Sequence, residues 1–411
     1  MENYGFVPTD ILLPKNADMT KWSCVACDQY TSEPEYWQEV ENTVGDSVST
    51  LRLMLPEIYL ENTNELSNII SDNMKKYVNE DIFKTIKNSF IYVQRTLSNG
   101  NIRHGLIGAI DLEVYDFSKN TKSLCRPTEA TVTSRLPARV KVRSNAEIEM
   151  PHIMMLIDDK LHKVTEQFNN YTDHLEKLYD FDLMMNSGHI KGYKVDGKYA
   201  QMALDAIANL YKSDDSKNPM LYAMGDGNHS LAAAKQYYEQ IKSENPKKAE
   251  SHPARYALVE LVNLHDNSLE FEPIFRVVFD INKNEFMNMF KDYCGLMKGK
   301  HSGQQFKLIE NGKITDYTFT KPESLLTIGT IQNFLDFYNK NYCGETDYIH
   351  GEDVVYKLCD RDDRLGFIVD GIDKDSFFDV IKKDGILPRK TFSMGHACDK
   401  RFYLECRKIT E

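Results

Sequence analysis

Apolar and polar positions along the chain change repeatedly between the spacing of a strand and the spacing of a helix. Residues 220–224 form a short apolar run, which is typical of a buried strand. Apolar residues at helical spacing begin at Leu231, and this helix must end before Pro246. Residues 255–264 form another apolar run. The pattern therefore predicts a strand, a tight turn at 225–230, a helix and a second strand.

The remaining periodicity predicts a mixture of helices and strands, with no internal repeat. Such a mixture indicates an α/β fold, namely a mixed sheet with flanking helices. At 411 residues the chain is long enough for two parts. We expect an α/β core that carries the turn in residues 1–270. Residues 271–411 form a C-terminal α/β portion that is either separate or packed into the same sheet. Among the expected elements are helices at 66–77, 161–175, 201–211 and 331–338 and strands at 89–95, 152–157, 354–359 and 401–409.

The overall charge and the cysteine usage exclude several classes of protein. The net charge of −12 opposes a non-specific grip on nucleic acid or on an anionic membrane. No run approaches the roughly 18 apolar residues of a membrane-spanning helix, and the acidic, polar first residues are unlike a signal peptide. The eight cysteines are dispersed, which favours reduced thiols over a disulfide framework. We therefore expect a cytoplasmic protein that binds neither nucleic acid nor membrane.

Cys24 and Cys27 have the C-x-x-C spacing of a redox or zinc motif. No second pair with zinc-ligand spacing follows them. The pair also does not lie between a strand and a helix of a βαβ unit, where a thioredoxin-type site would place it. A redox role for this pair therefore ranks below the functions that the turn indicates.

The turn 225–230, with the sequence Gly-Asp-Gly-Asn-His-Ser, carries the residues with the clearest chemistry. A strand that ends in a glycine-rich turn and opens a helix presents free backbone N–H groups and the positive end of the helix dipole. That arrangement suits a phosphate or a carboxylate. Asp226 and His229 add a general base, a metal ligand or a phosphate clamp. The alternative is a purely structural turn, in which glycine gives backbone freedom and the polar side chains cap the helix.

A basic stretch forms the second group of candidate residues. It begins at Arg126-Pro-Thr-Glu129 and continues through Arg135 in an otherwise acidic protein. Because arginine pairs with phosphate through two hydrogen bonds, Arg126 and Arg135 are candidates for anion capture, with a solvated face or ion pairing as the alternative. Glu129 differs in kind, since a carboxylate in this setting is a catalytic base, a metal ligand or an ion-pair partner. Lys390, near the end of the chain, is a further candidate phosphate ligand.

Four stretches of the sequence resemble a known family. Residues 225–234 resemble the Asp-Gly-His-His-Arg motif, followed by a helix of small residues, of a large bacterial and archaeal family known as a domain of unknown function. Residues 26–30, 126–129 and 387–392 agree with the same family, so the resemblance spans nearly the whole chain. The motif is also similar to the Gly-x-His-Arg phosphate-binding turn of the ParB/sulfiredoxin superfamily. That superfamily includes free serine kinases that use ADP or ATP.

This resemblance implies a ParB/sulfiredoxin-like core in which the turn and the helix N-terminus hold the phosphates of ADP or ATP. On that basis Asp226, Gly227 and His229 hold phosphate or Mg²⁺, with Asp226 as the metal ligand. Glu129 is the candidate base that activates the acceptor hydroxyl. Catalytic roles then fall to Glu129, Asp226 and His229, and cofactor binding falls to Gly225, Gly227, Asn228, Ser230, Arg126, Arg135 and Lys390.

Ser230 departs from the family motif, which has arginine at this position. Either Arg126, Arg135 or Lys390 supplies the missing phosphate clamp, or the phosphoryl chemistry is absent. The leading hypothesis is a phosphotransferase that binds a nucleotide and a small-molecule substrate, for example serine. The rival hypothesis, which Ser230 favours, is a non-catalytic regulatory protein that senses a nucleotide or metabolite with the same turn.

Overall fold

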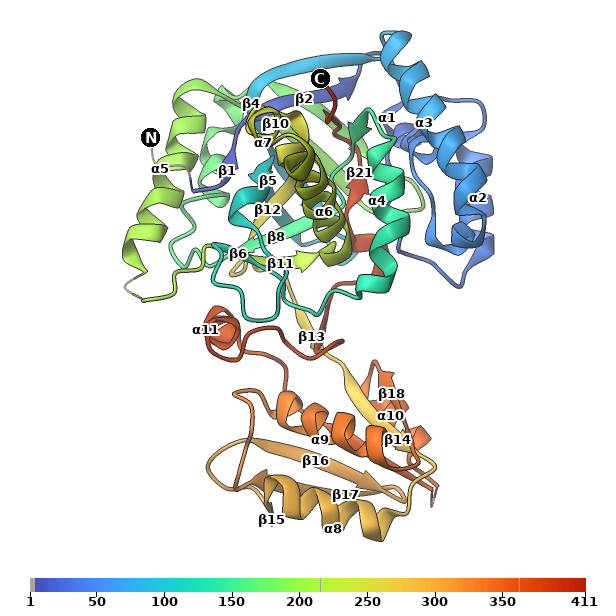
Figure 1. Cartoon of the computed structure of the whole chain (residues 1–411), viewed down its shortest axis with the longest axis vertical. Helices are drawn as coiled ribbons and strands as arrows, with labels where there is room; N and C mark the ends of the chain where they lie inside the picture. The colour runs from blue at the N-terminus through green and yellow to red at the C-terminus, as the bar shows by residue number, and fades with distance from the viewer. Residues whose placement is uncertain (1–3, 215, 362) are drawn as a thin grey trace. The chain divides into compact units, whose positions relative to one another are not determined.

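The computed structural model describes residues 4–214, 216–361 and 363–411 and divides into two units (Figure 1). The first unit comprises the chain as far as Leu269 together with His396–Glu411, and the second comprises Glu270–Gly395. The observed boundary lies next to the one expected after residue 270. The expected C-terminal portion was 271–411, but its last residues, His396–Glu411, belong to the first unit.

The first unit is built on a ten-stranded mixed sheet. Its strands and those of two small additional sheets are β1 (Phe6–Val7), β2 (Thr9–Pro14), β3 (Cys24–Val25), β4 (Phe83–Thr96), β5 (Ile102–Asp111), β6 (Cys125–Arg126), β7 (Ile148–Glu149), β8 (Ile153–Ile157), β9 (Lys177–Asp182), β10 (His189–Val195), β11 (Tyr222–Asp226), β12 (Tyr256–Asn263), β21 (Phe402–Tyr403) and β22 (Arg407–Lys408). The large sheet has the order β6-β11-β8-β12-β5-β4-β10-β9, with β1 paired to β5 and β2 to β4.

The direction of the strands around β11 decides where the turn lies. β8 runs parallel to β12 and antiparallel to β11. Asp226, at the end of β11, therefore lies opposite Met154, near the start of β8. The turn therefore lies at one end of these strands, and the carboxyl ends of β8 and β12 lie at the other end.

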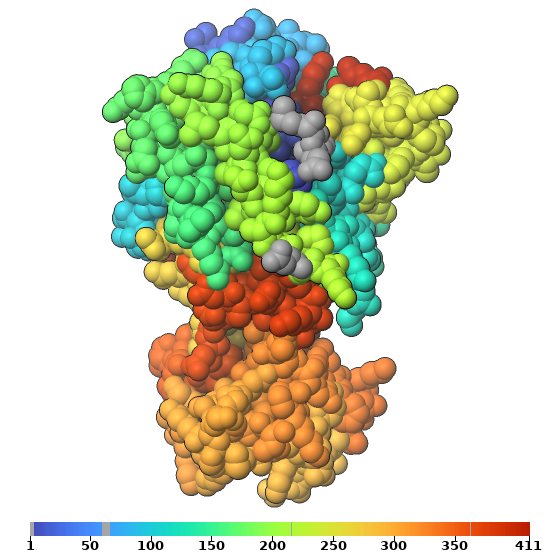
Figure 2. All heavy atoms as spheres, turned by 90° about the vertical axis from the view of Figure 1, so that its left-hand side faces the viewer, coloured from blue at the N-terminus to red at the C-terminus, as the bar shows by residue number. Residues whose placement is uncertain are grey.

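Helices cover both faces of this sheet. Strand alternation sends Ile91 of β4 to one face and Tyr92 to the other. The first face packs against α2 and α3, and the second packs against α5 and α6, the helix that follows the turn. Figure 2 views the first unit from the side of α5. The α-helices are α1 (Met19–Trp22), α2 (Pro34–Val44), α3 (Thr63–Asn79), α4 (Leu136–Ser144), α5 (Gly197–Ser213), α6 (Asn228–Glu244) and α7 (Pro246–Ala249). Short 3-10 helices lie at η1 (Thr50–Leu53), η2 (Glu57–Asn62), η3 (Leu112–Val114), η4 (Thr133–Arg135), η5 (Glu166–His174), η6 (Pro253–Arg255) and η7 (Ala397–Asp399).

The second unit has a six-stranded antiparallel sheet of its own. Its strands are β14 (Phe275–Phe279), β15 (Leu296–Lys298), β16 (Gln305–Glu310), β17 (Lys313–Phe319), β18 (Glu345–Ile349) and β19 (Arg364–Ile368), and β13 (Phe271–Pro273) pairs separately with β20 (Phe392–Met394). Its helices are α8 (Lys283–Cys294), α9 (Thr327–Asn341), α10 (Glu352–Leu358) and α11 (Lys374–Asp384). Phenylalanines of α8 and α9 pack on one side of this sheet, and Val355 of α10 packs on the other.

The mixed α/β fold that the sequence predicts is confirmed, although some individual elements differ. The strand expected at 354–359 is wrong, because α10 begins after Gly351 with two acidic residues in its first turn, where they favour a helix N-terminus. The helix expected at 161–175 is reduced to η5, since the Asp159 carboxylate accepts hydrogen bonds from backbone N–H groups of the preceding loop. None of the helices in the described residues combines the length and apolar character that a membrane span requires.

Candidate functional site

The turn between β11 and α6 depends on Gly227. This residue has a φ of 79° and occupies the N-cap position of α6 without a side chain that could cap the helix. The first backbone N–H groups of a helix have no acceptor within the helix, so α6 presents donors and a positive dipole end here. A Cβ atom at Gly227 would lie 2.9 Å from Cδ2 of His152 and 3.0 Å from Cα of Ile153. Glycine therefore permits both the left-handed backbone and the close approach of His152.

Three side chains that could hold a metal ion converge beside this turn. Asp28 follows β3, His152 precedes β8 and Asp226 ends β11, and one ligand atom of each lies within 4.8 Å of the others. His152 Nε2 lies 3.2 Å from Oδ2 of Asp28. The ammonium group of Lys400, from the returning C-terminal segment, lies 3.1 Å from Oδ2 of Asp226. The cluster thus joins four segments that are distant in the sequence.

The pair of Asp28 and His152 is ionised. Burial opposes the charge of His152, but the neighbouring Asp28 carboxylate and the Tyr403 hydroxyl raise the pKa of His152 well above its usual 6.5. Burial likewise opposes the charge of Asp28, but His152 holds the pKa of the Asp28 carboxyl below its usual 3.8. With both ring nitrogens protonated, His152 donates from Nδ1 to the Tyr403 hydroxyl at 2.7 Å. Tyr403 in turn donates to Sγ of Cys27 at 3.2 Å.

The side chains of this cluster that could bind a metal ion suit magnesium better than a softer metal. Because His152 keeps its proton, the ligands available are the carboxylates of Asp28 and Asp226. Mg²⁺ is usually bound by one or two carboxylates together with water and phosphate oxygens. Asp226 already uses Oδ1 to accept a hydrogen bond from the backbone N–H of Gly227 at 2.8 Å, which fixes the orientation of its carboxylate.

His229 is a neutral imidazole. Burial, together with the charges of Arg139 and Arg135, lowers the pKa of His229 below its usual 6.5. Its Nε2 accepts a hydrogen bond from the backbone N–H of Val132 at 3.1 Å. The proton of the neutral ring therefore lies on Nδ1. Sequence reasoning offered His229 as a general base, a metal ligand or a phosphate clamp, and in the structure the neutral ring has one N–H group to donate, at Nδ1.

The basic stretch passes across the turn. Thr128 Oγ1 donates to the carbonyl of Met224 at 2.7 Å, and Val132 is bonded to His229, so Glu129 lies on a segment held to the turn at both ends. Arg126 is only 2% exposed. Its guanidinium donates to the oxygens of Ser123, Asn218 and Pro219, which anchors β6 and leaves Arg126 committed to protein acceptors.

The other expected binding residues are divided between the two units. Gly225 lies in β11, and Asn228 begins α6 with a buried Oδ1 that has no hydrogen-bond partner among the described residues. Arg135 is exposed at the start of α4, and Ser230 lies in the first turn of α6, where it lines a cavity. Lys390 lies in the second unit, with Nζ 5.7 Å from the ring centre of Tyr348.

Sequence reasoning did not assign a role to the residues that complete the cluster. Asp28 was quoted as part of the stretch 26–30, but only as a family resemblance. His152, Lys400 and Tyr403 stand alone in the sequence, without a recognisable motif. The C-x-x-C pair does not form one site, since Cys24 is buried beside Ser49, whereas Cys27 is partly exposed beside Tyr403.

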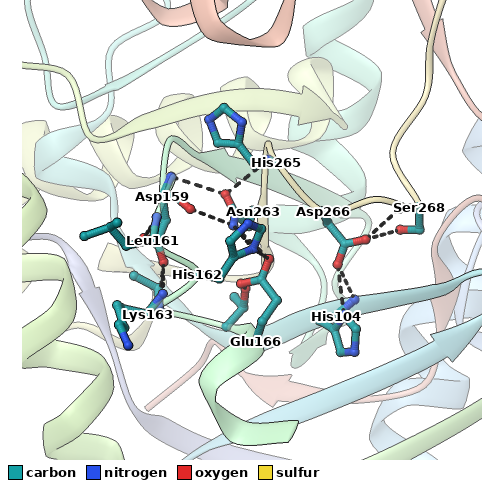
Figure 3. Close-up of polar contacts among 12 residues, drawn as sticks. His104, Asp159, Leu161, His162, Lys163, Glu166, Asn263, His265, Asp266 and Ser268 are labelled. Carbon is teal, nitrogen blue, oxygen red and sulfur yellow. Dashed lines mark hydrogen bonds and ion pairs between the residues drawn. The ribbon is translucent and has the colours of Figure 1, made fainter.

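A second polar cluster lies at the other end of the strands from the turn, beyond the carboxyl ends of β8 and β12 (Figure 3). Asn263 donates through Nδ2 to the carbonyl of Asp159 at 2.9 Å and to Glu166 Oε1 at 2.8 Å. Asp266 accepts from His104 Nδ1 at 3.0 Å and from Ser268 Oγ at 2.6 Å. These side chains bind one another and the backbone of their own loops, which is a structural role.

Comparison with known proteins identifies the family of this chain, but the description of that family names no activity. The sequence profile of one family, described as "Protein of unknown function (DUF1015)", matches residues 8–338. None of the curated proteins compared with the sequence matches it.

Several solved structures align with the fold at low identity. One is a free serine kinase mutant in complex with AMP, with 12% identity, a TM-score of 0.39 and coverage of 74% of this chain and 91% of that chain. Another is a conserved hypothetical protein from Pyrococcus furiosus, with 11% identity, a TM-score of 0.37 and coverage of 74% and 94%. A third is SbnI from Staphylococcus aureus with a C-terminal truncation, with 8% identity, a TM-score of 0.38 and coverage of 72% and 87%. At these TM-scores the alignments carry no argument about activity, so function has to be argued from the site.

Proposed function

Because this chain belongs to the DUF1015 family of proteins of unknown function, we propose its function from the geometry of the turn: it binds a nucleotide and transfers a phosphoryl group to a small hydroxyl compound. One observation carries the proposal. The uncapped N-terminus of α6 lies directly beside two carboxyl side chains, those of Asp28 and Asp226. An anion-binding helix end next to a carboxylate pair is the combination that binds phosphate together with a divalent cation.

Each residue has a distinct part in this proposal. The N–H groups of α6 after Gly227 bind phosphate oxygens. Asp226 and Asp28 hold Mg²⁺, which offsets the phosphate charge when it is bound. Arg135, whose charge already acts on His229, adds a positive charge near the turn. Lys400 neutralises Asp226 in the absence of a cation.

The chemical step requires a base on the acceptor. Glu129, on the segment that crosses the turn, accepts the proton of the acceptor hydroxyl. The acceptor oxygen forms a bond to the terminal phosphorus of ADP or ATP. The bond from that phosphorus to its bridging oxygen breaks, and AMP or ADP leaves with the electron pair. Holding the two reactants in line supplies much of the rate enhancement in reactions of this type.

Ser230 supports a second candidate function, that of a non-catalytic protein that senses a nucleotide or metabolite. The related motif has arginine at this position, and arginine would stabilise the charge that develops on a transferred phosphoryl group. In this chain the small Ser230 side chain lines a cavity instead. Both functions predict nucleotide binding at the turn, so turnover distinguishes them.

The test is calorimetric titration of ADP and ATP, with and without Mg²⁺, into the wild type and Asp226→Asn. We expect Mg²⁺-dependent binding that is at least about tenfold weaker in the variant, since an ionic ligand is lost. Asp10→Asn is the matched control, because Asp10 also pairs with a lysine, Lys87, and accepts a backbone N–H group, but lies outside the cluster. Nucleotide binding and turnover that are both unchanged in Asp226→Asn would contradict the proposal.

A further inference from the structure

A cavity with a volume of about 190 Å³ lies beside the first turn of α6, within the first unit. Helices α4 and α6 pack side by side along it (Figure 1). Many of the side chains that line it are aliphatic residues or methionines, and they come from segments that are far apart in the sequence. Members of this apolar wall include Met54, Met74, Val142, Met150, Ala233 and Ile409. Methionine-rich walls adapt to ligands of different shape.

The size of the cavity limits its occupant. An engineered cavity of about 150 Å³ holds one benzene molecule. By proportion, a cavity of this size holds roughly eight non-hydrogen atoms, which is about a third of a nucleoside diphosphate. The cavity is therefore too small for the nucleotide of the proposed reaction, and it suits a small molecule with one apolar ring or chain.

One of the residues that line the cavity has a hydrogen-bond donor without an acceptor. Arg143 lines it and donates from Nη2 to Oε2 of Glu149 at 2.7 Å, while its buried Nε has no hydrogen-bond partner among the described residues. Glu149 is itself shared, since it also accepts from Nε of Arg407 at 2.7 Å. A buried N–H group without a partner costs free energy, which a ligand oxygen would recover.

The charges around the cavity favour an anion over a zwitterion. Arg139 is paired with Glu57, and Arg143 is paired with Glu149, so both lining carboxylates already have cationic partners. An amino acid such as serine would need a carboxylate for its ammonium group, and each of these two is engaged. The paired arginines still offer N–H donors, which suit a carboxylate.

One side of the cavity adjoins the candidate site. His152, which belongs to the carboxylate cluster, and Ser230, in the first turn of α6, both line it. Tyr403 and Cys27, which are hydrogen-bonded to each other, line it as well. A molecule in the cavity can therefore have its apolar body in the methionine-rich part and a hydroxyl group near the turn.

We infer that this cavity binds a small organic acid with an apolar body, whose carboxylate accepts the Nε–H of Arg143. The further statement that a hydroxyl-bearing acid of this class is the phosphoryl acceptor rests on the function proposed above. The ligand class differs from serine in having no ammonium group and in having an apolar body. The inference assigns specificity to Arg143 and to the apolar wall, neither of which belongs to the turn.

The test is calorimetric titration of benzoate, benzyl alcohol and serine into the full chain without nucleotide. We expect benzoate to bind, benzyl alcohol to bind about tenfold more weakly or not at all because it lacks the carboxylate, and serine not to bind. In Arg143→Lys, which keeps the charge opposite Glu149 but removes the Nε–H donor, benzoate should bind about tenfold more weakly. Arg52→Lys is the matched control, since Arg52 also pairs with a glutamate, Glu41, but is not among the residues that line the cavity.

A second variant tests the cavity without changing a charge. Ala233→Leu extends a side chain into the cavity and should abolish benzoate binding, with its folding checked by the unfolding temperature without ligand. Binding of serine but not of benzoate, equal binding of benzyl alcohol and benzoate, undiminished benzoate binding in both variants, or no binding of any probe would each overturn the inference. Because no nucleotide is present, failure of nucleotide binding at the turn leaves this result unaffected, and the two proposals fail separately.

Discussion

The hydroxyl of Tyr403 lies 2.7 Å from Nδ1 of His152, although the whole second unit separates the two residues in the sequence. Tyr403 belongs to β21, which pairs with β3 just before Cys27 and Asp28. The returning segment also supplies Lys400 to Asp226. The candidate site is therefore completed only after the chain has passed through the second unit and come back.

The backbone at Gly227 gives a prediction with a matched control in the same unit. Gly227→Ala and Gly197→Ala both place a Cβ on a residue with positive φ, 79° and 50°, which costs about 1 kcal/mol in each case. At Gly227 the Cβ would also approach His152 and Ile153, whereas at Gly197 nothing lies within 4 Å. We expect Gly227→Ala to lower the free energy of unfolding by a further ~1–3 kcal/mol, measured by urea denaturation. Equal losses in the two variants would mean that the close approach of His152 does not constrain the turn.

Asp266 gives a prediction for acid stability. Burial opposes its charge, but hydrogen bonds from His104 and Ser268 hold the pKa of the Asp266 carboxyl below its usual 3.8. A carboxyl with a lowered pKa in the folded state contributes stability that is present above its unfolded pKa and is lost as the pH falls through its folded pKa. The difference in unfolding free energy between wild type and Asp266→Asn should therefore be constant above about pH 4 and shrink below it.

Urea denaturation at a series of pH values from roughly 2 to 6 measures this difference. Asp173→Asn serves as the control, since Asp173 is an exposed carboxylate in the same unit. A gap between wild type and Asp266→Asn that stays the same throughout this range would show that the contacts of Asp266 do not depend on its charge.

Local pattern was sufficient to predict the turn. The apolar run before residue 225, the glycines and the small-residue helix are all close in sequence, so they specify a strand, a turn and a helix without knowledge of distant contacts. The structure has β11 ending at Asp226 and α6 beginning at Asn228. The open helix N-terminus at Gly227 follows from the same local information.

The rest of the site depends on contacts that no local pattern encodes. Periodicity does not show that β8 runs antiparallel to β11, which is what brings His152 to the turn. Lys400 and Tyr403 come from a segment whose return to the first unit depends on packing over the whole chain. Arg126 was a candidate anion ligand because of its charge. In the folded protein it is buried and donates to three protein oxygens, and neither its burial nor these contacts can be predicted from the sequence around it.

Glu260 leads to a prediction about the buried charges of the large sheet. This carboxylate on β12 is completely buried, with Oε2 3.1 Å from Nη1 of Arg401 and Oε1 3.9 Å from Nε of Arg103. Gly105 makes room for it, since a Cβ there would lie 2.3 Å from Oε1. Glu260→Gln leaves the two arginines buried without this counter-charge, and removing one partner of a buried pair costs about 3–5 kcal/mol.

Urea denaturation of wild type and Glu260→Gln at neutral pH measures this loss. The control is Asp353→Asn, because Asp353 and its partner Lys357 are 71% and 77% exposed and such a pair is worth at most about 1 kcal/mol. Burial and the charge of Arg103 lower the pKa of the nearby Arg95 to about 9, so the buried arginines already oppose one another before Glu260 is removed. A loss in Glu260→Gln as small as that in the surface control would mean that the arginines find other counter-charges, and Asp399 and Glu405 are then the first residues to substitute next.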